Sequence, residues 1–201
     1  AHMGVVAKLK DGRSVNLFSA KDPGKDYMSP IGYGALMGIL RNYEVLNPLA
    51  NYTNDALNRL KPGFEAPISI VTSLGLSVDF PSRNRTVLCG LIRDTRDPMA
   101  TRFELRSPNA KSNTYLVFAG GYLAMLDGIE AALGSQKTPA ELCSSISKDY
   151  GAEDFYLEKN RIYRTEKNVY DDYTQGEREK YFGIAPLTVW ENLEAFDRYP
   201  E

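Results

Sequence analysis

The chain has 201 residues, of which 43% are hydrophobic and 25% are charged, and its formal net charge at pH 7 is −2. This length and apolar content predict one globular domain with its own core. The near-neutral charge excludes a strongly basic nucleic-acid surface. We find no signal peptide and no apolar run that reads as a membrane span. We therefore expect a cytoplasmic protein without nucleic-acid or membrane partners.

Cysteine and histidine usage restricts the available chemistry. Cys89 and Cys143 form no disulfide framework and match no zinc spacing, which indicates reduced, buried thiols. Ala1-His2-Met3 is typical of residues left after tag removal, so we interpret residues 1–3 as a cloning scar and residues 4–201 as the single domain. Because His2 is the only histidine, chemistry in the domain would depend on carboxylates and arginines.

The first expected elements are a hairpin over residues 8–18, turning at Asp11-Gly12, and a helix that begins at Ser29-Pro30. The apolar stripe of this helix consists of Ile31, Ala35, Leu36, Ile39, Leu40 and Tyr43. Residues 47–58 are polar and predict an irregular loop, and residues 67–73 predict a strand.

The second half predicts further strands and then helices. Residues 74–82 read as a short hairpin, and strands follow over 85–93 and 101–106, with a turn at Asp97-Pro98. A long helix is expected over 112–133, a helix from Thr138-Pro139, a loop over 170–175 and a short helix over 188–196. We expect the core stripe of the long helix to be Leu116, Ala119, Leu123, Leu126 and Ile129. The order predicts an α+β fold, an antiparallel β-sheet flanked by helices.

Two stretches carry charges that could bind a substrate. In the block from Arg59 to Pro67, Arg59 and Glu65 lie six residues apart around Pro62-Gly63. On physical grounds alone, a surface turn with two solvated charges is the better explanation of this block. On the strand over 101–106, Arg102, Glu104 and Arg106 share one face because strand side chains alternate. A solvated edge strand would give the same alternation.

Six pieces, in this order, resemble the carboxyl-terminal half of a glutamine synthetase catalytic domain. They are Asn47-Pro48, the Arg59–Pro67 block, Asn84-Arg85-Thr86, Arg102-x-Glu104-x-Arg106, Asn113-x-Tyr115-Leu116 and Leu123–Ile129. The resemblance begins near Asp11-Gly12 and fades from Ala131, and residues 74–82 make one connection longer than in the family. It implies that the sheet is part of the family's catalytic barrel. It also implies that this chain is a piece of a longer protein, whose upstream part carries a metal-binding histidine and several metal-binding glutamates.

The resemblance implies roles for the charged residues. Glu104 would be a ligand of Mg²⁺ or Mn²⁺, Arg102 would contact nucleotide phosphate, and Arg59 and Arg106 would bind glutamate. On a flap that closes over the site, Glu65 would favour ammonium and help to remove its proton.

The arginines expected at the phosphates match the family only in part. Arg85 would meet the transferring γ-phosphoryl group of ATP. The family has a further phosphate-binding arginine where this chain has Gly90, and Arg93, three residues later, would be the arginine that binds ATP in its place. The alternative for Arg93 and Arg96 is surface charge paired with Asp94 or Asp97.

The implied function is ATP-dependent ligation of glutamate and ammonium to glutamine through a γ-glutamyl phosphate. A γ-glutamyl amide or polyamine ligase, a guanidino kinase and a non-catalytic structural relative remain as alternatives, although we find none of the substrate-loop motifs of a guanidino kinase. We expect the longer parent to form a ring homo-oligomer. The 201-residue piece itself should be inactive, and a monomer or a weak dimer.

Overall fold

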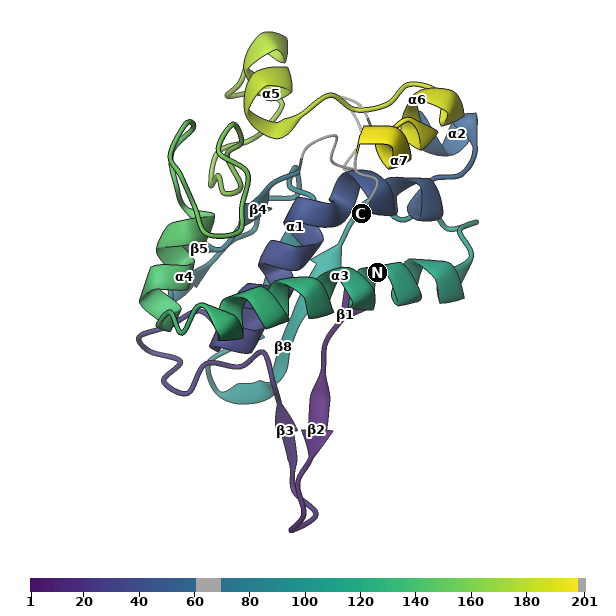
Figure 1. Ribbon diagram of the computed structural model, residues 1–201. Coiled ribbons are helices and arrows are strands. Elements are labelled where there is room, and N and C mark those ends of the chain that lie inside the picture. Colours follow the sequence, from purple (N-terminus) through teal and green to yellow (C-terminus); the bar gives the residue numbers. More distant parts are fainter. Residues whose placement is uncertain (61–69, 199–201) are drawn as a thin grey trace.

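The computed structural model describes residues 1–60 and 70–198. The strands are β1 (His2–Met3), β2 (Val6–Lys8), β3 (Ser14–Asn16), β4 (Thr72–Ser73), β5 (Gly75–Ser77), β6 (Phe80–Pro81), β7 (Cys89–Asp94) and β8 (Asp97–Leu105). The helices are α1 (Pro30–Ala50), α2 (Asn54–Leu57), α3 (Thr114–Gly134), α4 (Pro139–Ile146), α5 (Gln175–Phe182), α6 (Val189–Leu193) and α7 (Ala195–Arg198). Figure 1 shows α1 and α3 crossing beside the sheet, the β2–β3 ribbon projecting at one end, and α5 to α7 gathered at the other.

The main sheet has the strand order β1-β8-β7-β4. β8 pairs with β1 and β7 in antiparallel fashion, but β4 and β7 are parallel. The expectation of a purely antiparallel sheet was therefore wrong at this edge, although the α+β class is confirmed. The reason lies in the hairpin expected over residues 74–82, which is present as β5–β6 and separates β4 from β7. With this hairpin between them, β4 and β7 run in the same direction.

The expected turns are confirmed in one case and displaced in another. The β2–β3 hairpin turns at Gly12, whose φ of 87° is readily adopted by glycine. The turn before β8 lies at Thr95-Arg96, earlier than the expected Asp97-Pro98, because the Asp94 carboxylate accepts a hydrogen bond from the Arg96 backbone at 2.8 Å.

Helix α1 begins as predicted and ends later than predicted. The Ser29 hydroxyl accepts a hydrogen bond from the Gly32 backbone at 3.0 Å, which caps the helix. The helix then continues through Asn47-Pro48 to Ala50, and α2 occupies part of the expected loop. Its polar end is stable in the core because the buried Asn47 side chain bonds the Tyr43 hydroxyl at 2.7 Å and the Asn192 side chain at 2.8 Å.

Helix α3 forms as expected, but the predicted core stripe was wrong at four of its five positions, and of these five residues only Ile129 packs against the core. Leu116, Leu123 and Leu126 are 49%, 67% and 50% exposed. The buried positions are Val117, Gly121, Ala124, Met125, Gly128 and Ala132. Both faces of the helix are apolar, so the spacing of apolar residues could not predict which face is buried. The small residues face α1 because they allow the two helices to approach closely. By length and composition alone α3 could also cross a membrane, contrary to our interpretation of the sequence, but the core helix of a soluble protein can pass the same test.

Residues 1–3 belong to the sheet. His2 lies opposite Glu104 and Met3 opposite Phe103, and the Met3 side chain is fully buried beside Gly121. Their origin as a cloning scar stays a prediction, but β1 covers the edge of β8 in this fold.

The carboxyl-terminal region packs against the rest of the chain through short helices. A capping box between Thr138 and Glu141 starts α4, as predicted from Thr138-Pro139. Thr174 caps α5, and the short helix expected over 188–196 is divided into α6 and α7.

Candidate active site

The charged strand face predicted for β8 is present. Phe103 and Leu105 are buried, whereas Arg102, Glu104 and Arg106 are partly exposed. Phe18 stacks on Phe103 with ring centroids 4.8 Å apart, which fixes the core side of the strand. The core thus determines which way the three charged side chains point.

Arg106 joins two of the sequence motifs. Its Nη2 donates to Glu104 Oε2 at 2.7 Å, and the two side chains are only 11% and 25% exposed. Its Nη1 donates to the carbonyl oxygens of Asn84 at 2.9 Å and Val87 at 3.3 Å. The Asn84-Arg85-Thr86 segment is therefore held beside the charged face of β8.

The other expected substrate residues lie around this centre or outside the described part of the chain. Arg59 donates from Nη1 to the Pro108 carbonyl at 3.4 Å, just beyond the end of β8. The exposed Arg85 lines an open cavity of about 620 Å³, together with Arg83 and the β5–β6 hairpin. Glu65 and the Pro62-Gly63 turn lie outside the described residues, so the expected flap stays a prediction.

His2 is the residue that the sequence reasoning set aside. Its Cα lies opposite that of Glu104, and its Nδ1 accepts a hydrogen bond from Arg102 Nε at 3.2 Å. The imidazole thus stands next to the charged triplet. Interpreting residues 1–3 as a scar removed it from consideration. The available signal was the apolar residues that follow it, Met3 and Val5, which are typical of a strand entering a core.

Arg93 does not join the charged face. Its guanidinium donates to the carbonyl oxygens of Pro23 at 2.5 Å and Asp26 at 3.2 Å, and it lies 5.9 Å from the centre of the Tyr27 ring. It is therefore tied to the loop before α1. Arg96 forms the expected exposed ion pair, with 3.4 Å between Arg96 Nε and Asp94 Oδ1.

The described residues fit only part of a divalent metal site. Across residues 1–60 and 70–198, no cluster of three or more His, Cys, Asp or Glu side chains could hold an ion. Glu104 can supply one oxygen ligand of the kind that Mg²⁺ and Mn²⁺ prefer. A complete coordination shell would need ligands from elsewhere.

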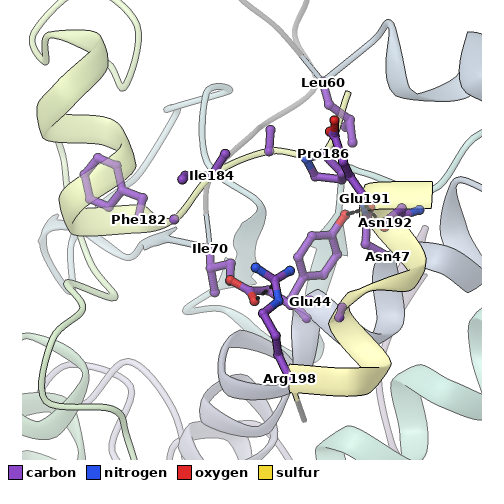
Figure 2. A pocket seen from close by; sticks show the side chains of 14 residues that line it. Glu44, Asn47, Leu60, Ile70, Phe182, Ile184, Pro186, Glu191, Asn192 and Arg198 are labelled. Carbon is purple, nitrogen blue, oxygen red and sulfur yellow. Dashed lines mark hydrogen bonds and ion pairs between the residues drawn. The ribbon is translucent and has the colours of Figure 1, made fainter. Parts of the chain in front are cut away.

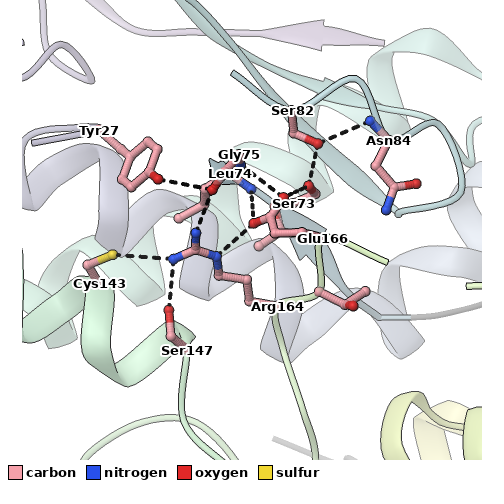
Figure 3. Close-up of polar contacts among 12 residues, drawn as sticks. Tyr27, Ser73, Leu74, Gly75, Ser82, Asn84, Cys143, Ser147, Arg164 and Glu166 are labelled. Carbon is pink, nitrogen blue, oxygen red and sulfur yellow. Dashed lines mark hydrogen bonds and ion pairs between the residues drawn. The ribbon is translucent and has the colours of Figure 1, made fainter. Parts of the chain in front are cut away.

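A network in the carboxyl-terminal region anchors the β5–β6 hairpin (Figure 3). The Glu166 carboxylate accepts hydrogen bonds from the Ser73 hydroxyl, from the backbone N–H groups of Leu74 at 3.1 Å and Gly75 at 3.0 Å, and from Arg164 Nε at 2.9 Å. Burial by itself would raise the pKa of Glu166, but the hydrogen bonds from Ser73, Arg164 and Leu74 outweigh it and hold the pKa below its usual range.

Arg164 extends this network to two further elements. It donates to the Gly75 carbonyl at 2.8 Å and to the Ser147 hydroxyl beyond α4 at 3.0 Å, while the Tyr27 hydroxyl donates to the same carbonyl at 3.0 Å. The hairpin that lengthens this connection is therefore fixed by residues 164–166. No pattern in the sequence indicates this pairing, because the partners are some ninety residues apart and residues 164–166 lie beyond the stretch that we matched to the family.

A second cavity lies between the end of α1 and the carboxyl-terminal helices (Figure 2). It leaves about 30 Å³ for the centres of water-sized molecules, and Tyr43, Leu60 and Phe182 are among its lining residues. At its side, Glu44 pairs with Arg161 at 2.6 Å and faces Arg198 at 3.7 Å. Among the described residues that we expected to bind substrate, none lines this cavity, so we do not assign it to catalysis.

The cysteines are free, as expected. Burial raises the pKa of Cys89 to about 12, which makes its thiol inert at neutral pH. Cys143 is only partly buried, so the expectation of two buried thiols was wrong for it.

The fold and this site define an α+β domain in which one sheet face presents arginines around a carboxylate, an arrangement suited to anionic substrates. Residues 1–149 match the model of the glutamine synthetase catalytic domain. The chain belongs to the glutamine synthetase family.

Individual relatives agree with this assignment and extend the match. The chain is 36% identical to the glutamine synthetase of Frankia alni over 117 residues, covering 54% of this chain and 23% of that protein. It is 30% identical to that of Methylococcus capsulatus over 185 residues, covering 81% of this chain and 36% of that protein. The similarity thus continues past Ala131, where we expected it to fade. The chain spans only about a quarter to a third of these relatives.

Two solved structures share the fold. The Plasmodium falciparum glutamine synthetase superposes with a TM-score of 0.61 at 19% identity, covering 99% of this chain and 38% of that chain. GmaS in a complex with ADP superposes with a TM-score of 0.59 at 23% identity, covering 98% of this chain and 36% of that chain. At these identities the likeness shows the fold alone.

Proposed function

We propose that this chain is the carboxyl-terminal portion of the catalytic domain of an ATP-dependent glutamate–ammonia ligase. The single observation that carries the proposal is the Arg102-Glu104-Arg106 face of β8, held beside Asn84-Arg85-Thr86 by the hydrogen bonds of Arg106. Because the chain belongs to the glutamine synthetase family, we interpret this cluster as part of the active site. The domain would work in the cytoplasm, on glutamate, ammonium and ATP.

Each charged group has a role in the proposal. Arg59 and Arg106 would bind glutamate carboxylate, Arg102 the nucleotide phosphates, and Arg85 the γ-phosphoryl group as its charge develops. Guanidinium groups suit these roles because they remain charged at every working pH and can hold two oxygens at once. Glu65 would favour ammonium over neutral ligands, because a carboxylate attracts a small cation.

For the proposed metal site, this chain would contribute the ligand Glu104. Glu104 would hold Mg²⁺ or Mn²⁺ together with residues of the upstream part, and the bound ion would neutralise phosphate charge. In the described chain Glu104 pairs with Arg106 instead, at 2.7 Å. We propose that Glu104 exchanges this partner for the ion when the domain is complete. His2, across from Glu104, would remain next to the phosphate-binding arginines.

A second candidate is a γ-glutamyl ligase that uses a larger amine. The observation that favours it is the wall of the cavity beside Arg85, where Leu76 and Phe80 are 85% and 70% exposed. An apolar wall near the transferred phosphoryl group would favour an amine with an apolar substituent over ammonium. The structural likeness to GmaS is compatible with either candidate.

The test uses the full-length parent with ATP, glutamate and a panel of ammonium, methylamine and ethylamine. Phosphate release and the mass of the γ-glutamyl product identify the amine. Glutamine as the preferred product supports the first candidate, and a preferred alkylamide supports the second. A parent that turns over none of these substrates would point to a non-catalytic relative.

The isolated 201-residue chain should show no ligase activity, since it contributes one carboxylate to a metal site that needs several. ATP-dependent glutamine formation by this chain alone would contradict the proposal. The full-length parent should assemble as a ring homo-oligomer.

A further inference from the structure

Gly90 lies at the one position where this chain departs from the arginine pattern that its family resemblance implies. It pairs directly with Glu104 across β7 and β8, so a side chain at this position would stand on the charged face. A Cβ added to Gly90 would lie 2.8 Å from Arg106 Nη2, 3.2 Å from Cζ and 3.3 Å from Nη1. The space of the missing side chain is therefore occupied by the guanidinium of Arg106.

Backbone strain does not explain the glycine. The described glycines with positive φ are Gly12, Gly75, Gly151 and Gly183, and Gly90 is not among them. An alanine could adopt the same backbone, and the atoms that it would meet belong to the end of a side chain. What position 90 requires is room for Arg106.

We call the position of the Arg106 guanidinium over Gly90 its seat. This position determines which groups the guanidinium can contact. There its Nη1 bonds the carbonyls of Asn84 and Val87, and its Nη2 bonds Glu104, while Nε is buried with no hydrogen-bond partner in the structure described. Three of the five N–H donors make contacts that fix the plane of the guanidinium, and the donors that remain are Nε–H and the second N–H of Nη2. The group is thus oriented before any ligand binds, which reduces the entropy lost on binding.

We infer that Gly90 is a positioning residue, which seats Arg106 to bind an anionic substrate group. This inference rests on the proposed function for the nature of the substrate, but not for the seat itself. In this chain the cation at the centre of the charged face would come from Arg106, which lies across position 90. The anion could be a glutamate carboxylate or a phosphoryl group, since guanidinium binds both.

A double-mutant cycle on the 201-residue chain tests the seat without any assay of activity. The variants are Gly90→Ala, Arg106→Ala and the double variant, compared by the midpoint of urea unfolding. Gly90→Ala should lower the midpoint when Arg106 is present and leave it unchanged or raised when Arg106 is absent. Gly176→Ala, at a glycine with nothing within 4 Å of an added Cβ, should shift the midpoint equally in both backgrounds. Equal effects of Gly90→Ala in the two backgrounds would refute the seat.

Kinetics of the full-length parent then test the positioning role and distinguish the two anions. Gly90→Ala should raise one KM about tenfold with a smaller change in kcat, because the charge remains but its orientation is lost. A higher KM for glutamate identifies a carboxylate, and a higher KM for ATP identifies phosphoryl. If Gly90→Ala lowered the unfolding midpoint only when Arg106 is present but left both KM values unchanged, the contact would be purely structural. That result would overturn the positioning role. If the full-length parent had no activity, the proposed function would be contradicted. The double-mutant cycle would still test whether Gly90 makes room for Arg106.

Discussion

The crossing of α1 and α3 gives the most sharply defined prediction for stability. An added Cβ at Gly38 would lie 1.9 Å from the Ala124 carbonyl oxygen and 3.0 Å from the Gly128 backbone nitrogen. At Gly128 it would lie 2.1 Å from the Gly34 carbonyl oxygen. These neighbours are backbone atoms in helices, so they cannot rotate away as a side chain can. Gly38→Ala must therefore push the helices apart.

The size of the effect follows from two opposing contributions. Alanine is favoured over glycine inside a helix by about 1 kcal/mol. Overpacking a core costs about 1–3 kcal/mol and occasionally more. Because a distance of 1.9 Å is far inside van der Waals contact, we take the upper end of that range. The expected result is a net loss of roughly 2 kcal/mol in the free energy of unfolding.

Urea unfolding monitored by circular dichroism measures this loss, with the slope m checked for constancy. Gly176→Ala in α5 is the matched control, because nothing lies within 4 Å of its added Cβ, and it should be neutral or stabilising by up to about 1 kcal/mol. If the Gly38→Ala variant were as stable as this control variant, the result would contradict the close packing of α1 against α3 at Gly38.

Three further predictions concern the site, its anchor and assembly. In the parent, Arg106→Lys should raise the KM for glutamate more than that for ATP, because lysine lacks the planar fork, and equal KM changes would contradict the assignment. Glu166 has a folded pKa below its ordinary value of 4.5, so its stabilisation is present above that value and lost as pH falls through the lowered pKa. Glu166→Gln should therefore lower the free energy of unfolding by about 1–3 kcal/mol at pH 7 and weaken its decrease at acidic pH. If the variant lost stability at acidic pH as steeply as the parent chain, Glu166 would not be the cause of that loss. Light scattering should show the 201-residue chain as a monomer or weak dimer, and Leu123→Lys on the exposed face of α3 should remove any dimer; a stable ring would refute this expectation.

The sequence predicted the charged strand well because alternation is a local property. Phe103 and Leu105 had to enter the core, so the side chains between them had to point the other way. The same kind of reasoning failed for α3, where apolar residues cover both faces and the choice was made by the small residues that allow α1 to approach. Periodicity identifies a buried face only where the opposite face is polar.

Contacts between distant parts of the chain could not be predicted. Arg164 and Glu166 hold the β5–β6 hairpin from about ninety residues away, and no pattern in the sequence links them to Gly75. His2 was missed for a different reason, because it was set aside before its neighbourhood was considered. The structure also shows that the guanidinium of Arg106 occupies the space beside Gly90, a position that the sequence could only mark as a departure from the family. Glu65 remains a prediction from the resemblance.

We propose that the charged face of β8 is the active-site face. The most direct test is the turnover of the full-length parent carrying Glu104→Gln, which keeps the size of the side chain and removes its charge. Asp97→Asn, at the exposed start of the same strand, is the matched control. Glu104→Gln should lower kcat about a hundredfold or more with little change in stability, because several kcal/mol of transition-state stabilisation depend on the ion. Asp97→Asn should leave kcat unchanged. Parental kcat and KM values in the Glu104→Gln variant would contradict the claim.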